Sequence, residues 1–136
     1  MWNCPTCRRV FEKTNQVHTC RTTPLEHHLK NKEIAKKLFE TLNSRINANV
    51  GSCKIVSIPC CIHLFGRYDF MAVLPKNDRL EIRFALNRVL QSSRLKMSVP
   101  LSHKYFKNCI DIRTEEEIDK ELIAVLKEAY HLKDET

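Results

Sequence analysis

Four side chains that bind soft metal ions lie near one another at the start of the chain. Cys4 and Cys7 form a C-x-x-C pair, and after ten further residues His18 and Cys20 form an H-x-C pair. Two cysteines at the first spacing can chelate one tetrahedral ion while the amides of the loop point at sulfur. Three thiolates and one imidazole fill the tetrahedron and leave no position for water. The spacing therefore predicts one structural Zn²⁺ ion and not a catalytic one.

The segment around these residues supports a bound metal ion. Residues 1–21 contain few apolar side chains and cannot form a core of their own, so another interaction must hold them folded. A structural zinc ion contributes on the order of 10 kcal/mol to such a fold. Two alternatives stay open: the thiols are incidental, or His27 or His28 supplies the fourth ligand in place of His18, because the H-x-C spacing is unusually short.

The remaining cysteines and the lack of long apolar runs limit the kinds of protein that this chain can be. The sequence shows no secretory leader and no membrane span, so we expect a cytoplasmic protein in a reducing compartment. In that compartment, seven cysteines in 136 residues indicate metal binding or catalysis more than disulfides. Cys53, Cys60, Cys61 and Cys109 fall in predicted strands, where free cysteine is a good core residue. Cys61 and His63 alternate onto one face and offer half of a second metal site, with no matching pair evident.

Charge is the second functional signal. The net charge is +7, divided as +3 over residues 1–24, +9 over 25–113 and −5 over 114–136. A basic body favours an anionic partner, so nucleic acid or nucleoprotein is the first candidate; solvation of the surface explains the charge equally well. A protein partner docked through the zinc head is the alternative, and no catalytic motif is present. The candidate contacts for nucleic acid are Arg8, Arg9, Arg88, Arg94, Lys96 and Lys104, and we expect Arg8 and Arg9 to be exposed.

The pattern of apolar residues predicts an α+β body behind the zinc knuckle. Thr23, Pro24 and Glu26 form a helix start, and the helix runs to a stop near Gly51. A closing helix follows the capping box of Thr114 and Glu117. The predicted strands cover residues 53–58, 60–65, 68–74, 79–86 and 106–112, joined by turns short enough for antiparallel pairing. Residues 87–105 are punctuated by serines, with a short helix at 87–91 as one option.

These elements give two predicted domains, a zinc knuckle at 1–23 and a body at 24–136. The body is expected to be a small antiparallel sheet packed by two long terminal helices. This division rests on the helix start at Pro24 and on the complete core pattern that follows it.

The chain resembles an uncharacterised bacterial family, number 5655 of the domains of unknown function. The resemblance is carried by W-x-C-P-x-C-x-R-x-F over residues 2–11, N-Q-x-H-x-C over 15–20, Y-D-F-M-A-V-L-P over 68–75, and the segments at 80–84, 116–119 and 127–130. It implies a compact α+β body distantly similar to the small YdhG-like domains, and no assigned activity. Pro59-Cys60-Cys61 departs from the polar turn expected there.

Overall fold

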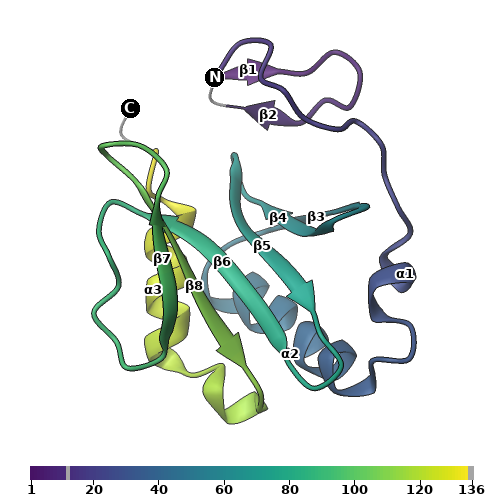
Figure 1. Cartoon of the computed structure of the whole chain (residues 1–136), viewed down its shortest axis with the longest axis vertical. Coiled ribbons are helices and arrows are strands. Elements are labelled where there is room, and N and C mark those ends of the chain that lie inside the picture. The colour runs from purple at the N-terminus through teal and green to yellow at the C-terminus, as the bar shows by residue number, and fades with distance from the viewer. Residues whose placement is uncertain (12, 135–136) are drawn as a thin grey trace.

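The computed structural model of the protein describes residues 1–11 and 13–134 (Figure 1). A two-stranded N-terminal head stands apart from a six-stranded antiparallel sheet with strand order β3-β4-β5-β6-β8-β7. Helices α2 and α3 cover one face of that sheet. The predicted α+β class, with an antiparallel sheet packed by helices that precede and follow it in the chain, is confirmed.

The head is a minimal ribbon. Strand β1 (Trp2–Asn3) pairs antiparallel with β2 (Val10–Phe11). The chain then runs without regular structure to the body, where the Thr23 amide donates a hydrogen bond of 2.9 Å to the Ser57 carbonyl of β3. The head therefore lies over the end of the sheet formed by β3, β4 and the start of β5.

The first helical region is interrupted, and the prediction of one continuous helix is wrong. Helix α1 (Leu25–Leu29) ends at Lys30, and α2 (Glu33–Asn49) begins after a break at Asn31, which has φ of 60°. Asparagine tolerates this left-handed conformation better than most residues, so the chain turns there. Thr23 makes no capping hydrogen bond to α1.

The sheet follows the predicted hairpins closely. Its strands are β3 (Lys54–Ile58), β4 (Cys61–Phe65), β5 (Asp69–Pro75), β6 (Leu80–Leu86), β7 (Leu95–Pro100) and β8 (Phe106–Ile112). Strands β3 to β6 form a meander, and β8 then pairs with β6 along seven residues. Strand β7 lies outside β8 at the edge.

Alternation places the core on the helix-covered face. Ile62, Val73, Ile82 and Ile110 occupy neighbouring register positions on β4, β5, β6 and β8, and all four are buried. They pack with apolar residues of α2 and α3 into one cluster of buried side chains. Branched side chains on a pleated surface pack efficiently in this way. The opposite face carries a smaller apolar cluster, Val56, Ile58 and Phe65, on the two strands nearest the head.

The segment of residues 87–105 differs from the option raised by its sequence. No helix forms at 87–91; the chain bends there and then forms β7. An edge strand buries little of either face, so its sequence has no regular alternation of apolar and polar residues. Met97, Val99 and Leu101 remain exposed along this edge.

The C-terminal helix is anchored at both of its ends. Thr114 and Glu117 form the predicted capping box, but they start a short 3₁₀ helix, η1 (Glu115–Glu117), and α3 (Lys120–Tyr130) begins separately at Asp119, which accepts a hydrogen bond from the Leu122 amide. At the other end, the Tyr130 hydroxyl donates to the Ser52 carbonyl at 3.0 Å.

The Tyr130 ring lies against both glycines of the chain. A Cβ atom at Gly51 would stand 2.7 Å from the ring, and one at Gly66 would stand 2.5 Å from it. Both values are too short for a carbon–carbon contact, so each glycine provides room that no other residue offers.

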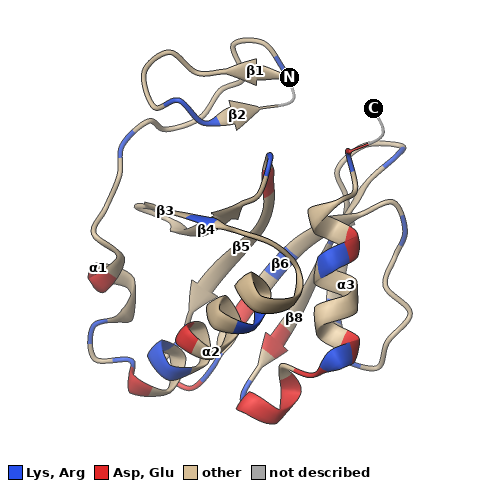
Figure 2. Cartoon of the chain, turned by 180° about the vertical axis from the view of Figure 1, so that it is seen from behind, with Lys and Arg blue, Asp and Glu red and all other residues tan. Residues whose placement is uncertain are grey.

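Charged side chains of both signs are interspersed along α2 and α3 (Figure 2). Among the residues that the structure describes, none of the helices combines the length and the apolar character needed to cross a bilayer.

Candidate metal centre

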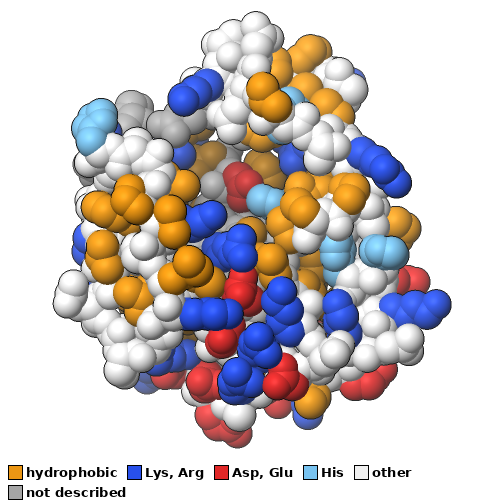
Figure 3. Space-filling view, in the orientation of Figure 1, with side chains coloured by type: hydrophobic (Ala, Val, Ile, Leu, Met, Phe, Trp, Pro, Cys, Tyr) orange, Lys and Arg blue, Asp and Glu red, His pale blue; other side chains and the backbone are white. Residues whose placement is uncertain are grey.

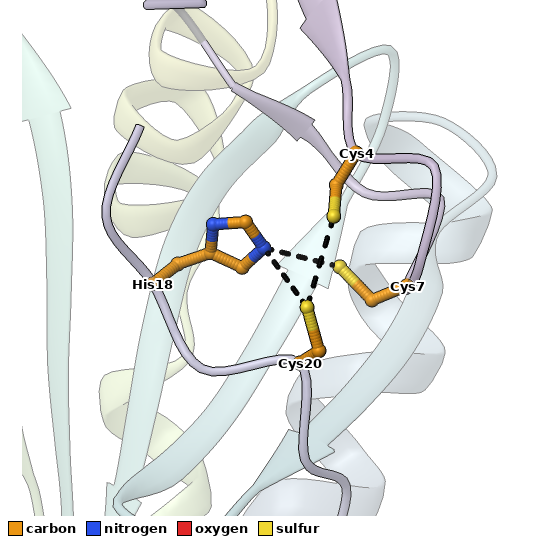
Figure 4. A group of neighbouring side chains, drawn as sticks. All are labelled: Cys4, Cys7, His18 and Cys20. Carbon is orange, nitrogen blue, oxygen red and sulfur yellow. Dashed lines mark hydrogen bonds between the residues drawn. The ribbon is translucent and has the colours of Figure 1, made fainter. Parts of the chain in front are cut away.

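The four predicted ligands come together at one point in the head (Figure 4). Their ligand atoms all lie within 4.8 Å of one another. The Sγ atoms of Cys4 and Cys20 are 3.7 Å apart, and His18 Nε2 lies 3.4 Å from Cys7 Sγ and 3.4 Å from Cys20 Sγ. A tetrahedral ion with usual Zn–S and Zn–N bonds has S···S edges of about 3.8 Å and S···N edges of about 3.6 Å. The cluster therefore fits a tetrahedral metal ion.

Backbone turns position the first two cysteines. The Cys4 amide donates to the Arg9 carbonyl at 2.9 Å, and the Arg8 amide donates back to the Cys4 carbonyl at 2.7 Å. Arg8 has φ of 62°, which closes the loop and turns the Cys7 side chain toward Cys4. The strands β1 and β2 flank this loop and hold it against the H-x-C segment.

The thiols in this cluster do not ionise alike. A hydrogen bond from the Cys7 amide lowers the pKa of Cys4 to about 6, in the manner expected of a C-x-x-C knuckle. Burial, followed by the neighbouring Cys4 and Cys7 thiols, raises the pKa of Cys20 to about 11. Three thiolates this close repel one another, and a cation between them removes that cost. The donor set itself therefore favours an occupied site.

A backbone carbonyl orients the imidazole. His18 Nδ1 lies 2.7 Å from the Gln16 carbonyl oxygen, a hydrogen bond that directs Nε2 toward the sulfurs. The same contact raises the pKa of His18. His28 is engaged elsewhere, with Nε2 2.7 Å from the Ile58 carbonyl oxygen, and neither it nor His27 joins the cluster. The structure thus groups His18, and not the alternatives, with the cysteines.

Arg9 is buried in the centre, contrary to the prediction that it is exposed. Only 7% of it is accessible. Its Nε donates to Cys7 Sγ at 3.4 Å, a second guanidinium nitrogen donates to the Thr19 carbonyl, and the guanidinium lies 5.4 Å from the Phe11 ring centroid. Three thiolates and a dication leave one negative charge, which a guanidinium in contact with sulfur balances.

The other basic residues proposed for nucleic acid come from different segments of the chain, and three of them are paired with acids. Arg8 and Lys104 are exposed on separate turns. The other three form ion pairs: Arg88 with Glu128 at 2.9 Å, Arg94 with Asp119 at 3.3 Å, and Lys96 with Glu81 at 2.8 Å. On the sheet face away from the helices, acidic and basic side chains are mixed (Figure 3).

A second cluster of ligand atoms lies in the body, where the sequence showed only half of it. Cys60 Sγ is 3.2 Å from Cys61 Sγ, and Cys61 Sγ is 3.1 Å from His63 Nε2. Cys60 is exposed in the turn between β3 and β4, so its assignment to the core is wrong, whereas Cys61 and Cys109 are buried and Cys53 is half-buried. The adjacent cysteines directly after Pro59 were the sequence feature that could have identified Cys60 as a third possible ligand.

The second cluster borders a cavity beneath the head. The cavity has a volume of about 450 Å³, and its walls include Arg9, Phe11 and His18 of the head and Cys60, His63 and Asp69 of the body. Figure 3 shows the corresponding hollow below the head. A larger hollow of about 970 Å³ lies along α1 and α2, and none of the ligands of the two clusters lines it. The smaller cavity therefore borders ligands of both clusters.

Comparison with known proteins finds a family model that matches the body. Residues 26–133 match the family model described as a domain of unknown function, DUF5655. The matched range leaves out the cysteines and histidine of the head. No curated protein and no solved structure matches the chain.

Proposed function

The chain belongs to the DUF5655 family of domains of unknown function, and we propose that in this member a zinc-bound head serves as a cap over a binding cavity. The observation that carries the proposal is the shared wall: Arg9 and His18 of the metal centre and His63 of β4 line the same 450 Å³ cavity. Four protein ligands close the coordination shell of the ion at Cys4, Cys7, His18 and Cys20, which is the arrangement of a structural zinc site.

The role of the ion in this proposal is to make the cap rigid. The head buries little apolar surface, so without metal it loses the contacts that fix Arg9 and His18 at the cavity wall. Thiolate and imidazole donors favour Zn²⁺ over the hard cations Mg²⁺ and Ca²⁺. The protein is then a zinc-stabilised binding module, and its ligand is held between head and sheet.

Elemental analysis of purified protein tests the zinc site. Cys4→Ser and Cys20→Ser should each carry one zinc ion fewer per chain than the wild type. Cys53→Ser removes a half-buried body thiol and should keep the wild-type content. Full zinc retention in both head variants refutes the structural site, and the cap with it.

Nucleic-acid binding is the more specific function that the charge favours. Arg88, Arg94 and Lys96 already have acidic partners, which offset the field that those three residues project. A salt series with single- and double-stranded DNA and RNA tests this function directly, because affinity for phosphates falls steeply with salt. Binding that disappears in the triple variant R88E/R94E/K96E supports it.

A protein partner at the head is the other specific function. Val17 projects from the head with 97% of its surface exposed. An exposed apolar residue on a rigid knuckle suits a protein contact better than a phosphate contact. If the wild type binds no nucleic acid at low salt and Val17→Asp abolishes capture of a protein partner, docking through the head is the supported function.

A further inference from the structure

We propose that Cys60, Cys61 and His63 form a second metal site, distinct from the site in the head, with one coordination position open to the cavity beneath the cap. The three ligand atoms, two Sγ and one imidazole nitrogen, lie within 4.8 Å of one another. This proposal does not depend on an ion in the head, since all three residues come from one hairpin of the body.

The hairpin brings the donors together by its geometry. Ile58, the last residue of β3, pairs with Cys61, the first residue of β4, so Pro59 and Cys60 form the two-residue turn. Side chains two apart on a strand point to the same face, which places Cys61 and His63 side by side. Cys60, at the turn, adds its thiol from the end of that face.

The distances show how the site must adjust to an ion. The separations of 3.2 Å between the sulfurs and 3.1 Å from sulfur to nitrogen are shorter than tetrahedral edges. An ion with ordinary bonds requires edges of about 3.8 Å and 3.6 Å. The ligands must therefore spread by about half an ångström. The exposed Cys60 side chain is free of core packing and can lengthen the sulfur–sulfur edge. The sulfur–nitrogen edge must lengthen by rotation of the half-buried His63 ring or of the Cys61 side chain.

A carboxylate lies behind the histidine. His63 Nδ1 is 2.7 Å from Asp69 Oδ2, although the ring N–H is not aligned with that oxygen as in a full hydrogen bond. Metal-binding histidines commonly place such a carboxylate at the ring nitrogen that does not bind the ion. Asp69 thus holds the ring with Nε2 directed at Cys61, and we assign it a positioning role.

The donor set selects the kind of ion. Two thiolates and one imidazole favour a thiophilic ion such as Zn²⁺ or Cu⁺ over Mg²⁺ or Ca²⁺. Three protein ligands leave the fourth position of a tetrahedral Zn²⁺ ion to water or to another small donor. Cys60 and His63 line the 450 Å³ cavity, so such a donor reaches the ion from there.

A free nucleophilic thiol is the competing interpretation of the same residues. Cys61, His63 and Asp69 lie in the order of a nucleophile, a base and an orienting acid. Cys60, however, lies as close to Cys61 as His63 does and has no part in that arrangement. A metal site uses all three ligand atoms and is therefore the better account.

The test is a zinc titration of the full chain, first stripped of metal, in a phosphine reductant that keeps Cys60 and Cys61 from pairing. Competition with a chromophoric chelator should give two Zn²⁺ ions per wild-type chain. Cys60→Ser and His63→Gln should each bind one, and Cys4→Ser should also bind one. Cys53→Ser should bind two, as the matched control for loss of a body thiol.

Two further measurements separate a metal site from other roles of these residues. Asp69→Asn should keep two ions but bind the second about 10–100-fold more weakly. Co²⁺ bound to Cys4→Ser should show the thiolate charge-transfer absorption, which should disappear in the double variant C4S/C60S. Loss of one ion in Cys4→Ser with none lost in Cys60→Ser or His63→Gln overturns the second site and leaves the head site intact. A wild type that binds a single ion, with Cys61 alkylated much faster than Cys53, replaces the second site with a reactive thiol.

Discussion

The contacts that Arg9 makes in the folded protein could not be recognised from the sequence. An arginine next to another arginine in a polar segment is typical of an exposed position, yet the Arg9 guanidinium is enclosed by Cys7, Thr19 and Phe11. Spacing alone identified the four residues of the Cys/His cluster, because chelation constrains spacing. It could not identify Arg9, because a residue that contacts a ligand can come from any nearby position.

Replacing Arg9 should weaken metal binding without removing a ligand. Arg9→Met keeps most of the side-chain volume but loses the donor to sulfur, so we expect zinc affinity at the head to fall about 10–100-fold. Competition with a chelator measures this. Arg8→Met is the matched control, because Arg8 is exposed and contributes to the loop through its backbone. Equal affinities in the two variants would contradict the role of the guanidinium.

Glu81 is a buried acid on the open face of the sheet, where it accepts hydrogen bonds from Arg83 and Lys96. Burial alone would raise its pKa, but hydrogen bonds from Lys96 and Arg83 outweigh burial, so the pKa of Glu81 is lowered. Its folded-state pKa is below the unfolded value of about 4.3. The stabilisation is therefore present above that pH and is lost as the pH falls through the folded-state pKa.

Glu81→Gln should consequently lower the free energy of unfolding at neutral pH by about 1–3 kcal/mol, because Lys96 and Arg83 lose a charged acceptor. The difference from wild type should shrink below about pH 4.3, where the wild-type carboxylate also becomes protonated. Urea unfolding across this range measures it. Glu26→Gln removes the same charge from an exposed helix position. A destabilisation that is independent of pH would show that packing, not charge, is responsible.

At the scale of elements, strands with one buried face were predictable and the rest were not. Strand β8 (Phe106–Ile112) was predicted to the residue, because its apolar positions alternate and turn signals bound it. Strand β7 was missed because both its faces are largely exposed. The break at Asn31 was missed because the apolar pattern at Ala35, Leu38 and Leu42 begins only after it.

The two candidate sites also differ in how far the sequence predicted them. Chelate spacing in the head brought Cys4, Cys7, His18 and Cys20 together from sequence. The second cluster needed the turn between β3 and β4, since Cys60 joins only if the turn has two residues. A turn one residue shorter puts Cys60 inside a strand, on the opposite face from Cys61.

The packing of α3 against two turns gives a prediction for this element. Gly66→Ala would push a Cβ atom into the Tyr130 ring and should cost about 1–3 kcal/mol. In a Tyr130→Leu background the same substitution should cost less, because the ring is gone. A double-mutant cycle by thermal or urea unfolding gives the coupling energy. Additive effects would mean that Gly66 is needed for its backbone and not for this contact.

At the scale of the whole molecule, head and body differ in what holds them. Every residue of the main buried cluster lies at position 29 or later, so the body has a core without the head. The head has the Cys/His cluster and the two-residue strands of its ribbon.

A chain that begins at residue 24 should therefore remain folded and melt cooperatively, with its far-ultraviolet circular dichroism unchanged except for the head. A chelator should change its melting temperature only through the Cys60, Cys61 and His63 site, whereas in the full chain it should also unfold the head. An unfolded truncated chain would show that the cap contributes to the core. This outcome would make the division at residues 23 and 24 wrong.

The strand order β6-β8-β7 determines when β7 can pair while the chain emerges from the ribosome. Strand β7 is synthesised before β8, the strand that lies between it and β6 in the sheet. At synthesis rates of about 5–20 residues per second, β7 waits roughly one second for its partner. During that wait its apolar side chains Met97 and Val99 and its unpaired backbone groups are open to other nascent chains. Lys96, at the start of the strand, carries the charge that discourages such encounters before β8 arrives.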